Sequence, residues 1–291
     1  MRYAAPTSVD EARTLLVDNP GSRVFAGATD LIPQFRAGSP QPAVMVDLKR
    51  IERLISVSHH GEGWTIGAAT PTSALTANTE FTAMFPGLSE ASGLIGSDQI
   101  QNRASWGGNL GNASPAADSV PALVAGDAQA VIATGDGTRI VPVSEIVTGP
   151  GQTSLAEDEF IIEFTLADPP ANTSDAYLRI IPRTEMDIAI VGVAARLTIQ
   201  GETITAASIL LGAVAPTVVR VADAEAALVA GRLENGSISD DTLVSVADAA
   251  SSACNPINDR RGTIEYRRQV AGVLTKRAVA VAADRARNGA V

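Results

Sequence analysis

The chain has 291 residues, of which 45% are hydrophobic and 19% are charged, which is typical of a water-soluble protein with two or three compact units. Its net charge is −10 at pH 7 and only 4% of its residues are aromatic, which argues against nucleic acid as a partner. No apolar run reaches the roughly 18 residues that cross a bilayer, so we expect no membrane span.

The N-terminal residues 1–16 turn acidic by residue 10 and hold no apolar signal core, so we expect a cytoplasmic protein. The single cysteine, Cys254, excludes an internal disulfide framework and any multi-cysteine metal or cluster site. Cys254 itself is expected to be a buried small hydrophobic residue rather than a nucleophile.

The first segment, residues 1–53, has the order of a βαβ unit. Residues 8–11 form a capping box that starts a helix, and residues 23–26 form a short strand. A turn over residues 27–30 leads into a helix with Pro33 in its first turn, and residues 42–48 form a second strand. We expect these elements to make a small first subdomain.

The second segment, residues 54–168, mixes hairpins with short helices. Strands at 54–58 and 64–68 flank a turn at 59–63, and strands at 130–134 and 138–143 form a second hairpin, followed by a strand at 160–166. Helices are expected at 72–78, 88–95 and 121–125. The proline-containing stretch 168–174 is the clearest boundary in the sequence.

The third segment, residues 175–291, begins with strands at 176–181, 188–199 and 203–214 and ends with helices at 221–229, 240–252 and 263–287. This order indicates an α+β protein. The last helix is basic on one side, which we expect to face solvent or a partner. The basic residues are Arg267, Arg268, Lys276, Arg277, Arg285 and Arg287.

A glycine-rich segment, residues 102–123, is the most informative stretch of the chain. It places three glycines beside small amide and hydroxyl side chains, a composition that suits an anion-binding concavity of backbone N–H groups, although such clusters also form ordinary turns. The residues are Ser105, Gly107, Gly108, Asn109, Gly111, Asn112 and Ser114, and the segment then reaches Asp118.

A second small-residue turn lies at residues 25–31, between a predicted strand and a predicted helix. Neither turn has the Walker sequence or the spacing of a Rossmann fingerprint. Two separate anion-binding turns instead indicate an elongated ligand with a central pyrophosphate, such as a dinucleotide.

Side chains able to perform chemistry are few. His59 and His60 fall in a predicted hairpin turn that is expected to face solvent, and Glu185 and Asp187 share one face of a predicted strand without needing a function. We therefore expect the chemistry to be that of a cofactor.

Four stretches together resemble one family. Residues 102–109, running on to Ser114–Asp118, are similar to the second FAD-binding motif of the molybdenum hydroxylase flavoproteins, and residues 26–30 are similar to the first. These flavoproteins are the medium subunits of carbon monoxide dehydrogenase, bacterial xanthine dehydrogenases and nicotine or quinoline dehydrogenases. Arg183 with residues 187–189, and the run 259–268, resemble patterns in their C-terminal domain. The resemblance covers essentially the whole chain.

The resemblance implies a vanillyl-alcohol-oxidase/PCMH-type FAD-binding fold in two subdomains, followed by a C-terminal domain of antiparallel sheet packed on helices. It also implies an electron-transfer subunit that binds FAD without a covalent link. The expected partners are a large molybdopterin subunit and a small subunit with [2Fe–2S] clusters, assembled as a dimer of heterotrimers. Electrons would pass from the clusters to FAD and then to an external acceptor.

The resemblance further implies which residues bind the cofactor, with Ile95 and Ile188 near the isoalloxazine ring and Arg179 close by. The full expected set is Arg23, Val24, Phe25, Ala26, Gly27, Ala28, Thr29, Asp30, Leu31, Ile95, Ala104, Ser105, Gly107, Gly108, Asn109, Ser114, Asp118, Ile161, Arg179 and Ile188.

Two positions depart from the family pattern. Trp106 stands where an isoleucine is usual, and its larger ring must be packed elsewhere in the fold. Ala28 replaces a glycine, and its Cβ is tolerable only if the residue avoids positive φ. The cysteine-rich insertion of the benzoyl-CoA-reductase-type members is absent from this sequence.

Two alternative functions are compatible with the sequence. One is a stand-alone FAD-dependent oxidase or reductase of the same superfold, in which His59 or His60 would be the candidates for a covalent flavin link. The other is a non-catalytic assembly module that has lost FAD, against which the intact glycine loops argue.

Overall fold

The computed structural model describes residues 1–234 and 236–289. They form two compact units, each built from separate stretches of the sequence. The first unit comprises Met1–Leu75, Ser97–Ser114 and Asp127–Ala167, and the second comprises Thr76–Gly96, Pro115–Gly126 and the chain from Asp168 onward. These units therefore divide the chain differently from the three consecutive segments 1–53, 54–168 and 175–291.

The first unit opens with a small parallel sheet in the order β1-β3-β2. Its strands are β1 (Arg2–Ala4), β2 (Arg23–Phe25) and β3 (Val44–Asp47), connected through the helices α1 (Val9–Asp18) and α2 (Leu31–Arg36). The Ser8 hydroxyl caps α1 by accepting a hydrogen bond from the N–H of Glu11 at 3.2 Å, as the sequence predicts. Strand β1 was not predicted from the sequence, because its three residues are largely exposed.

The first unit also contains a five-stranded antiparallel sheet in the order β4-β5-β10-β6-β7. Both predicted hairpins are present in it. The apolar β10 lies at its centre, and the strands are β4 (Val57–His60), β5 (Gly63–Gly67), β6 (Gln129–Thr134), β7 (Gly137–Pro142) and β10 (Phe160–Ala167). A two-stranded ribbon, β8 (Val147–Gly149) with β9 (Gln152–Thr153), precedes β10.

Two local predictions in the first unit are wrong. His59 and His60 belong to β4 rather than to the turn, and His59 stacks on Trp64 with ring centroids 4.6 Å apart. Residues of the glycine-rich segment form helix α7 (Trp106–Asn112) rather than a loop, and the short helix α6 (Asp98–Gln101) ends just before the segment. Burial of Trp106 and Leu110 overrides the poor helix propensity of the glycines between them.

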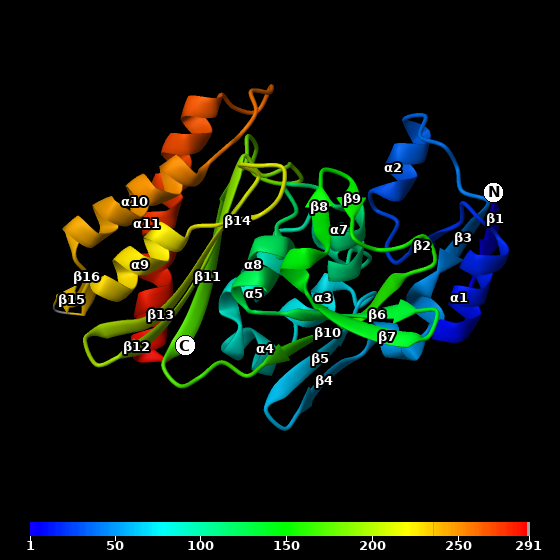
Figure 1. Ribbon diagram of the computed structural model, residues 1–291, viewed down its shortest axis with the longest axis horizontal. Helices are drawn as coiled ribbons and strands as arrows, with labels where there is room; N and C mark the ends of the chain where they lie inside the picture. Colours follow the sequence, from blue (N-terminus) through cyan, green and yellow to red (C-terminus); the bar gives the residue numbers. More distant parts are fainter. Residues whose placement is uncertain (235, 290–291) are drawn as a thin grey trace. The chain divides into compact units, whose positions relative to one another are not determined.

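The second unit is built on an antiparallel sheet in the order β11-β12-β13-β14. The strands are β11 (Thr173–Ile180), β12 (Val191–Gln200), β13 (Thr203–Gly212) and β14 (Val219–Arg220). One face is apolar and is covered by α9 (Ala222–Ala230) and α11 (Ile264–Asn288), against which α10 (Asp240–Ala253) packs; these are the yellow-to-red helices of Figure 1. The predicted strands and helices of this part of the chain are thus confirmed.

The opposite face of this sheet carries polar side chains of β11, because alternate residues of a strand point to opposite faces. Asp175 is buried there and accepts hydrogen bonds from the N–H groups of Gly87 and Leu88 at 2.9 and 3.1 Å. These two amides begin helix α5 (Pro86–Gly93), which together with α8 (Ser119–Ala125) comes from the N-terminal half of the sequence. The short helices α3 (Thr72–Thr76) and α4 (Thr79–Met84) precede α5.

The basic residues of the last helix, which were expected to face solvent or a partner, fall into two groups. Arg268, Arg277 and Arg287 are exposed, whereas Arg267 and Arg285 make contacts within the second unit. Arg267 is only 3% exposed and donates hydrogen bonds to the carbonyls of Ile190 and Ala213 at 2.6 and 3.0 Å. Arg285 donates to the carbonyl of Asp175 and pairs with Glu90 at 2.5 Å. These arginines therefore stabilise the second unit itself.

The described part of the chain contains no helix with the length and apolar character needed to cross a membrane.

Candidate functional site

The loop after β2 lies at the edge of the first sheet where its parallel strands end. We call residues 27–30 the amide loop. Within the described parts of the chain, no protein acceptor takes a hydrogen bond from the backbone N–H groups of Gly27, Ala28, Thr29 or Asp30. Because backbone donors in a folded protein are almost always satisfied, a run of free amides indicates a site for an anionic ligand. The carboxyl edge of parallel strands is also a common place for ligands to bind.

Glycine at position 27 allows two backbone segments to touch. A Cβ atom at Gly27 would lie 2.1 Å from the carbonyl oxygen of Arg103 and 3.0 Å from the nitrogen of Ala104, so no other residue fits without moving the backbone. The amide loop is thereby held directly against the segment that leads into α7.

Ala28 adopts the left-handed conformation, with φ of 57°. Its Cβ was expected to be tolerable only if the residue avoided positive φ, and this expectation is not met. A non-glycine residue in this region is strained by about 1 kcal/mol, and the surrounding loop must hold it there.

The N-terminus of α7 is capped by Ser105. Its hydroxyl accepts a hydrogen bond from the N–H of Gly108 at 3.2 Å, and its carbonyl accepts from the N–H of Asn109 at 3.0 Å. The N–H of Gly107 donates to the carbonyl of Ala68 at 3.0 Å. The amides around Gly108 that the sequence assigned to the pyrophosphate thus have partners inside the protein. The free donors are those of the amide loop.

The amide loop and α7 form two walls of a cavity of about 550 Å³ within the first unit, a volume in the usual range for cofactor sites. Fifteen of the predicted cofactor-binding residues line it: all of residues 23–31, together with Ala104, Ser105, Gly107, Gly108, Asn109 and Ile161.

The third wall of the cavity was missed by sequence reasoning. It consists of Gly151, Thr153, Leu155, Ala156, Glu157, Glu159 and Phe160. The Gly149-Pro150-Gly151 turn at its start was the available signal, since glycines beside proline mark a loop where the backbone is accessible. Gln34 and Asn112 also line the cavity.

Positive charge lies beside the cavity. Lys49 lies two residues after the end of β3 and donates from Nζ to the carbonyl of Ala69, a lining residue, at 3.2 Å. Partial burial lowers the pKa of the Lys49 ammonium, and the nearby Arg103 lowers it further. A bound anion would relieve this repulsion between two cations.

Five predicted cofactor residues lie outside the lining of this cavity. Ser114 belongs to the first unit, and the other four, Ile95, Asp118, Arg179 and Ile188, belong to the second unit. Ile95 is buried two residues after the end of α5, whereas Ile188 is 48% exposed. Their contact with a cofactor stays a prediction.

Asp118 and Arg179 form a buried ion pair in the second unit. The Asp118 carboxylate accepts hydrogen bonds from Arg179 at 2.5 Å and from the hydroxyl of Tyr177 at 2.8 Å. Burial raises the pKa of Asp118 to about 6, and Arg179 and Tyr177 limit that rise. Gly192 makes room for the phenol, because a Cβ there would lie 2.3 Å from the Tyr177 oxygen.

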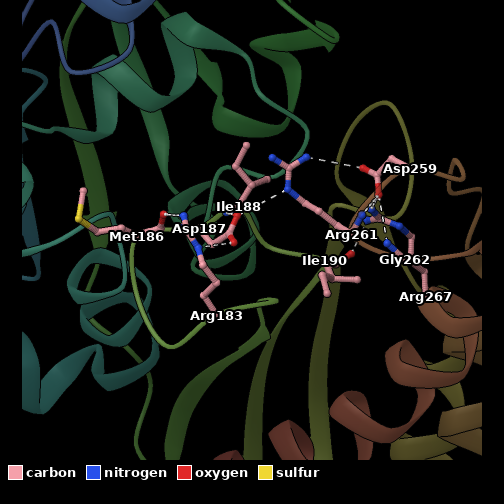
Figure 2. Close-up of polar contacts among 9 residues, drawn as sticks. All are labelled: Arg183, Met186, Asp187, Ile188, Ile190, Asp259, Arg261, Gly262 and Arg267. Atoms are coloured by element: carbon pink, nitrogen blue, oxygen red, sulfur yellow. Dashed lines mark hydrogen bonds and ion pairs between the residues drawn. The ribbon is translucent and has the colours of Figure 1, made fainter.

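Ile188 belongs to a loop that two arginines fix from opposite sides (Figure 2). Arg183 contacts Asp187 at 3.0 Å and donates to the carbonyl of Met186, while Arg261 lies 3.6 Å from the other oxygen of Asp187. The hydrogen bond from the N–H of Ile188, together with the Arg183 ion pair, keeps the pKa of Asp187 low. Glu185 and Asp187 lie in this loop rather than on a strand, so the proposed face shared by the two carboxylates is not present.

The other candidates for chemistry are unfavourably placed. Neither His59 nor His60 lines the cavity of the first unit. Cys254 is buried as expected, and burial raises the pKa of its thiol to about 11, so it is a poor nucleophile.

Comparison with known proteins identifies the family. Residues 1–168 match the FAD binding domain in molybdopterin dehydrogenase, and residues 176–282 match the CO dehydrogenase flavoprotein C-terminal domain. The chain belongs to the FAD-binding medium subunits of the molybdenum hydroxylases.

Named relatives agree along the whole length. The carbon monoxide dehydrogenase medium chain of Hydrogenophaga pseudoflava is 31% identical over 278 residues, which is 95% of each chain. A putative xanthine dehydrogenase FAD-binding subunit of Escherichia coli is 28% identical over 282 residues, covering 96% of this chain and 95% of the relative. A solved structure of carbon monoxide dehydrogenase from H. pseudoflava, lacking the Mo-pyranopterin moiety of its molybdenum cofactor, superimposes with a TM-score of 0.92 at 32% identity and 98% coverage of both chains.

The cofactor of this medium subunit is FAD, and the structure fits it. The unsatisfied amides of residues 27–30 suit a diphosphate, and the glycine contacts keep the cavity walls close together. The PCMH-type fold and the α+β class are confirmed by the structural match. Trp106, the larger residue of the second motif, is 1% exposed and packs edge-on against Phe164, with ring centroids 5.8 Å apart. It is therefore accommodated in the core.

We expect Ala28→Gly to raise the free energy of unfolding of the FAD-free medium subunit by up to about 1 kcal/mol, because glycine relieves the left-handed strain. Ala26→Gly is the matched control, because Ala26 is buried just before the amide loop and does not have a positive φ. This control substitution should lower the free energy of unfolding by about 1 kcal/mol. Urea unfolding of both variants measures the difference. Equal destabilisation by the two changes would contradict the assigned strain at Ala28.

We expect Asp118→Asn to destabilise the second unit by about 3 kcal/mol at pH 7.5, because Arg179 is then left buried without a counter-charge. Adding Arg179→Met should restore most of the loss, since no unpaired charge remains. Thermal unfolding of the single and double variants is the measurement. If the double variant is less stable than Asp118→Asn alone, the unpaired charge of Arg179 does not account for the stability lost in Asp118→Asn.

Proposed function

We propose that this medium subunit carries electrons within a heterotrimeric molybdenum hydroxylase. FAD would receive them from [2Fe–2S] clusters of a small subunit and pass them to an external acceptor. The observation that supports this most strongly is the agreement of both halves of the chain with the flavoprotein subunits of such enzymes, combined with an amide-lined cavity. We propose a cytoplasmic location for the complex and its assembly as a dimer of heterotrimers.

The cavity suggests how the first unit binds its cofactor. FAD supplies the redox chemistry when bound, while the protein supplies binding, orientation and charge. The free amides of residues 27–30 would hold the diphosphate with little reorganisation, because the contact at Gly27 already fixes them. Lys49 adds positive charge at the same edge of the sheet.

The isoalloxazine ring would lie against residues that the cavity does not include. We propose Ile95 and Ile188 as its neighbours and Arg179 as a nearby cation. The exposure of Ile188 supports this role, because an apolar side chain held at the surface by a fixed loop can contact a flat ring. Asp118 would then set the position of Arg179 through their ion pair.

A stand-alone oxidase with a covalently attached flavin is less compatible with this geometry. The two histidines that could form the link lie on β4 and do not line the cavity. Denaturing and precipitating the purified protein would distinguish the two functions. A non-covalent flavin is released into the supernatant, whereas a covalently attached flavin stays with the precipitated chain.

We expect Gly108→Val to reduce the FAD content of the purified subunit at least tenfold. The valine side chain would enter the cavity, because an added Cβ meets only the Ser105 hydroxyl, at 3.3 Å, within the protein. Absorbance of the flavin per chain gives the content, and the unfolding midpoint of the FAD-free form checks that the fold is kept. Ala167→Val, at an exposed end of β10 outside the cavity, is the control that should keep full occupancy. Full occupancy in Gly108→Val would count against FAD in this cavity.

We expect the subunit to co-purify with two other chains, one with bound molybdopterin and one with [2Fe–2S] clusters. Affinity purification of the natively expressed protein, with iron and molybdenum analysis, is the measurement. In the isolated complex, the reducing substrate should bleach the flavin absorbance only when the cluster-bearing chain is present. Flavin reduction by substrate in the isolated medium subunit would instead indicate a stand-alone oxidase.

A further inference from the structure

Helix α2 contributes Leu31 and Gln34 to the lining of the cavity but is lightly held by the rest of the first unit. None of its six residues is buried, and Ile32 is 37% exposed. Its backbone hydrogen bonds are local, such as those from the N–H groups of Ile32 and Gln34 to Ala28 and Asp30. The helix begins directly after the amide loop, so its position also sets the position of the free amides.

One long-range side-chain hydrogen bond ties α2 to the opposite wall. The amide nitrogen of Gln34 donates to the side-chain oxygen of Asn112 at 2.8 Å, and both residues line the cavity. Among the residues that the structure describes, no other side-chain hydrogen bond joins α2 to a distant segment. We call the pair Gln34 and Asn112 the latch.

The far side of the latch is firmly anchored. Asn112 is the last residue of α7, whose Trp106 and Leu110 are buried. The next residue, Ala113, accepts a hydrogen bond from the N–H of Gly151 on the third wall at 2.9 Å. If the latch opens, α2 is therefore the element that moves, and its movement exposes none of its own residues that were buried in the core.

We propose that Gln34 and Asn112 are positioning residues that hold α2 over the cofactor cavity and slow the release of FAD. The inference rests on the FAD site described above. A neutral hydrogen bond of this kind contributes enough to change a rate about two- to tenfold. Because α2 buries no core residue, breaking the latch affects the bound ligand far more than the stability of the empty fold.

The test measures the rate of FAD release from the full-length chain after dilution into an excess of the apo form of an FAD-specific oxidase, whose regained activity reports the released cofactor. Gln34→Ala and Asn112→Ala should each speed release about two- to tenfold, and the double variant should be no faster than the faster single variant. Gln34→Met keeps the side-chain length without the donor and should behave like Gln34→Ala. The exchanged pair, Gln34→Asn with Asn112→Gln, should restore slow release.

Controls separate the latch from a general loss of structure. Gln99→Ala removes an exposed glutamine of α6, in the same unit but outside the cavity, and should leave the release rate unchanged. The unfolding midpoint of the FAD-free latch variants should stay at the wild-type value. The latch would be overturned if the single variants released FAD at the wild-type rate, or if the double variant released FAD faster by the product of the two single effects. It would also be overturned if the unfolding midpoint of the FAD-free variants fell as the release rate rose. A wild-type chain that never binds FAD would instead overturn the FAD site itself.

Discussion

The cavity of this flavoprotein subunit depends on two backbone contacts that only glycine permits. Gly27 holds the amide loop against the carbonyl of Arg103, and Gly107 holds the start of α7 against the carbonyl of Ala68. Side chains at these positions would separate the walls, since their Cβ atoms would lie within 2.6 Å of main-chain oxygens. The free amides of residues 27–30 can act together on one ligand because these contacts fix the loop in place.

The second unit shows how far the tertiary fold departs from the order of the sequence. Its sheet is covered on the polar face by α5 and α8, which come from the half of the chain that matches the FAD binding domain. Buried carboxylates join these helices to the sheet: Asp175 receives the first amides of α5, and Asp118, just before α8, pairs with Arg179 of β11. A family boundary near residue 168 is therefore not a boundary between independently packed bodies.

The chain provides a binding environment rather than a set of reacting side chains. Its cysteine is buried with a raised pKa, its histidines lie away from the cavity, and the carboxylate of Asp187 is engaged by two arginines. What the cavity offers is oriented donors, a nearby cation in Lys49, and a lining helix, α2, which the Gln34–Asn112 hydrogen bond ties to α7. Such a division of labour suits a subunit whose redox chemistry belongs to its cofactor.

The long periodic elements, such as β12, β13 and α11, and both motifs that line the cavity can be predicted from local sequence, because these signals act between residues a few positions apart. What those segments contact depends on how the chain packs. Residues 106–112 became helical because Ser105 caps them and Trp106 and Leu110 are buried, although the glycines alone favour a loop. Strand β1 exists because β3, 42 residues along the chain, pairs with it, and Arg267 is buried because its carbonyl partners lie on distant strands and loops. Contacts between residues so far apart leave no local pattern, so the Gln34–Asn112 bond could not be read from the sequence. The Gly149-Pro150-Gly151 turn marks an accessible loop in the sequence, but not the cavity that this loop faces.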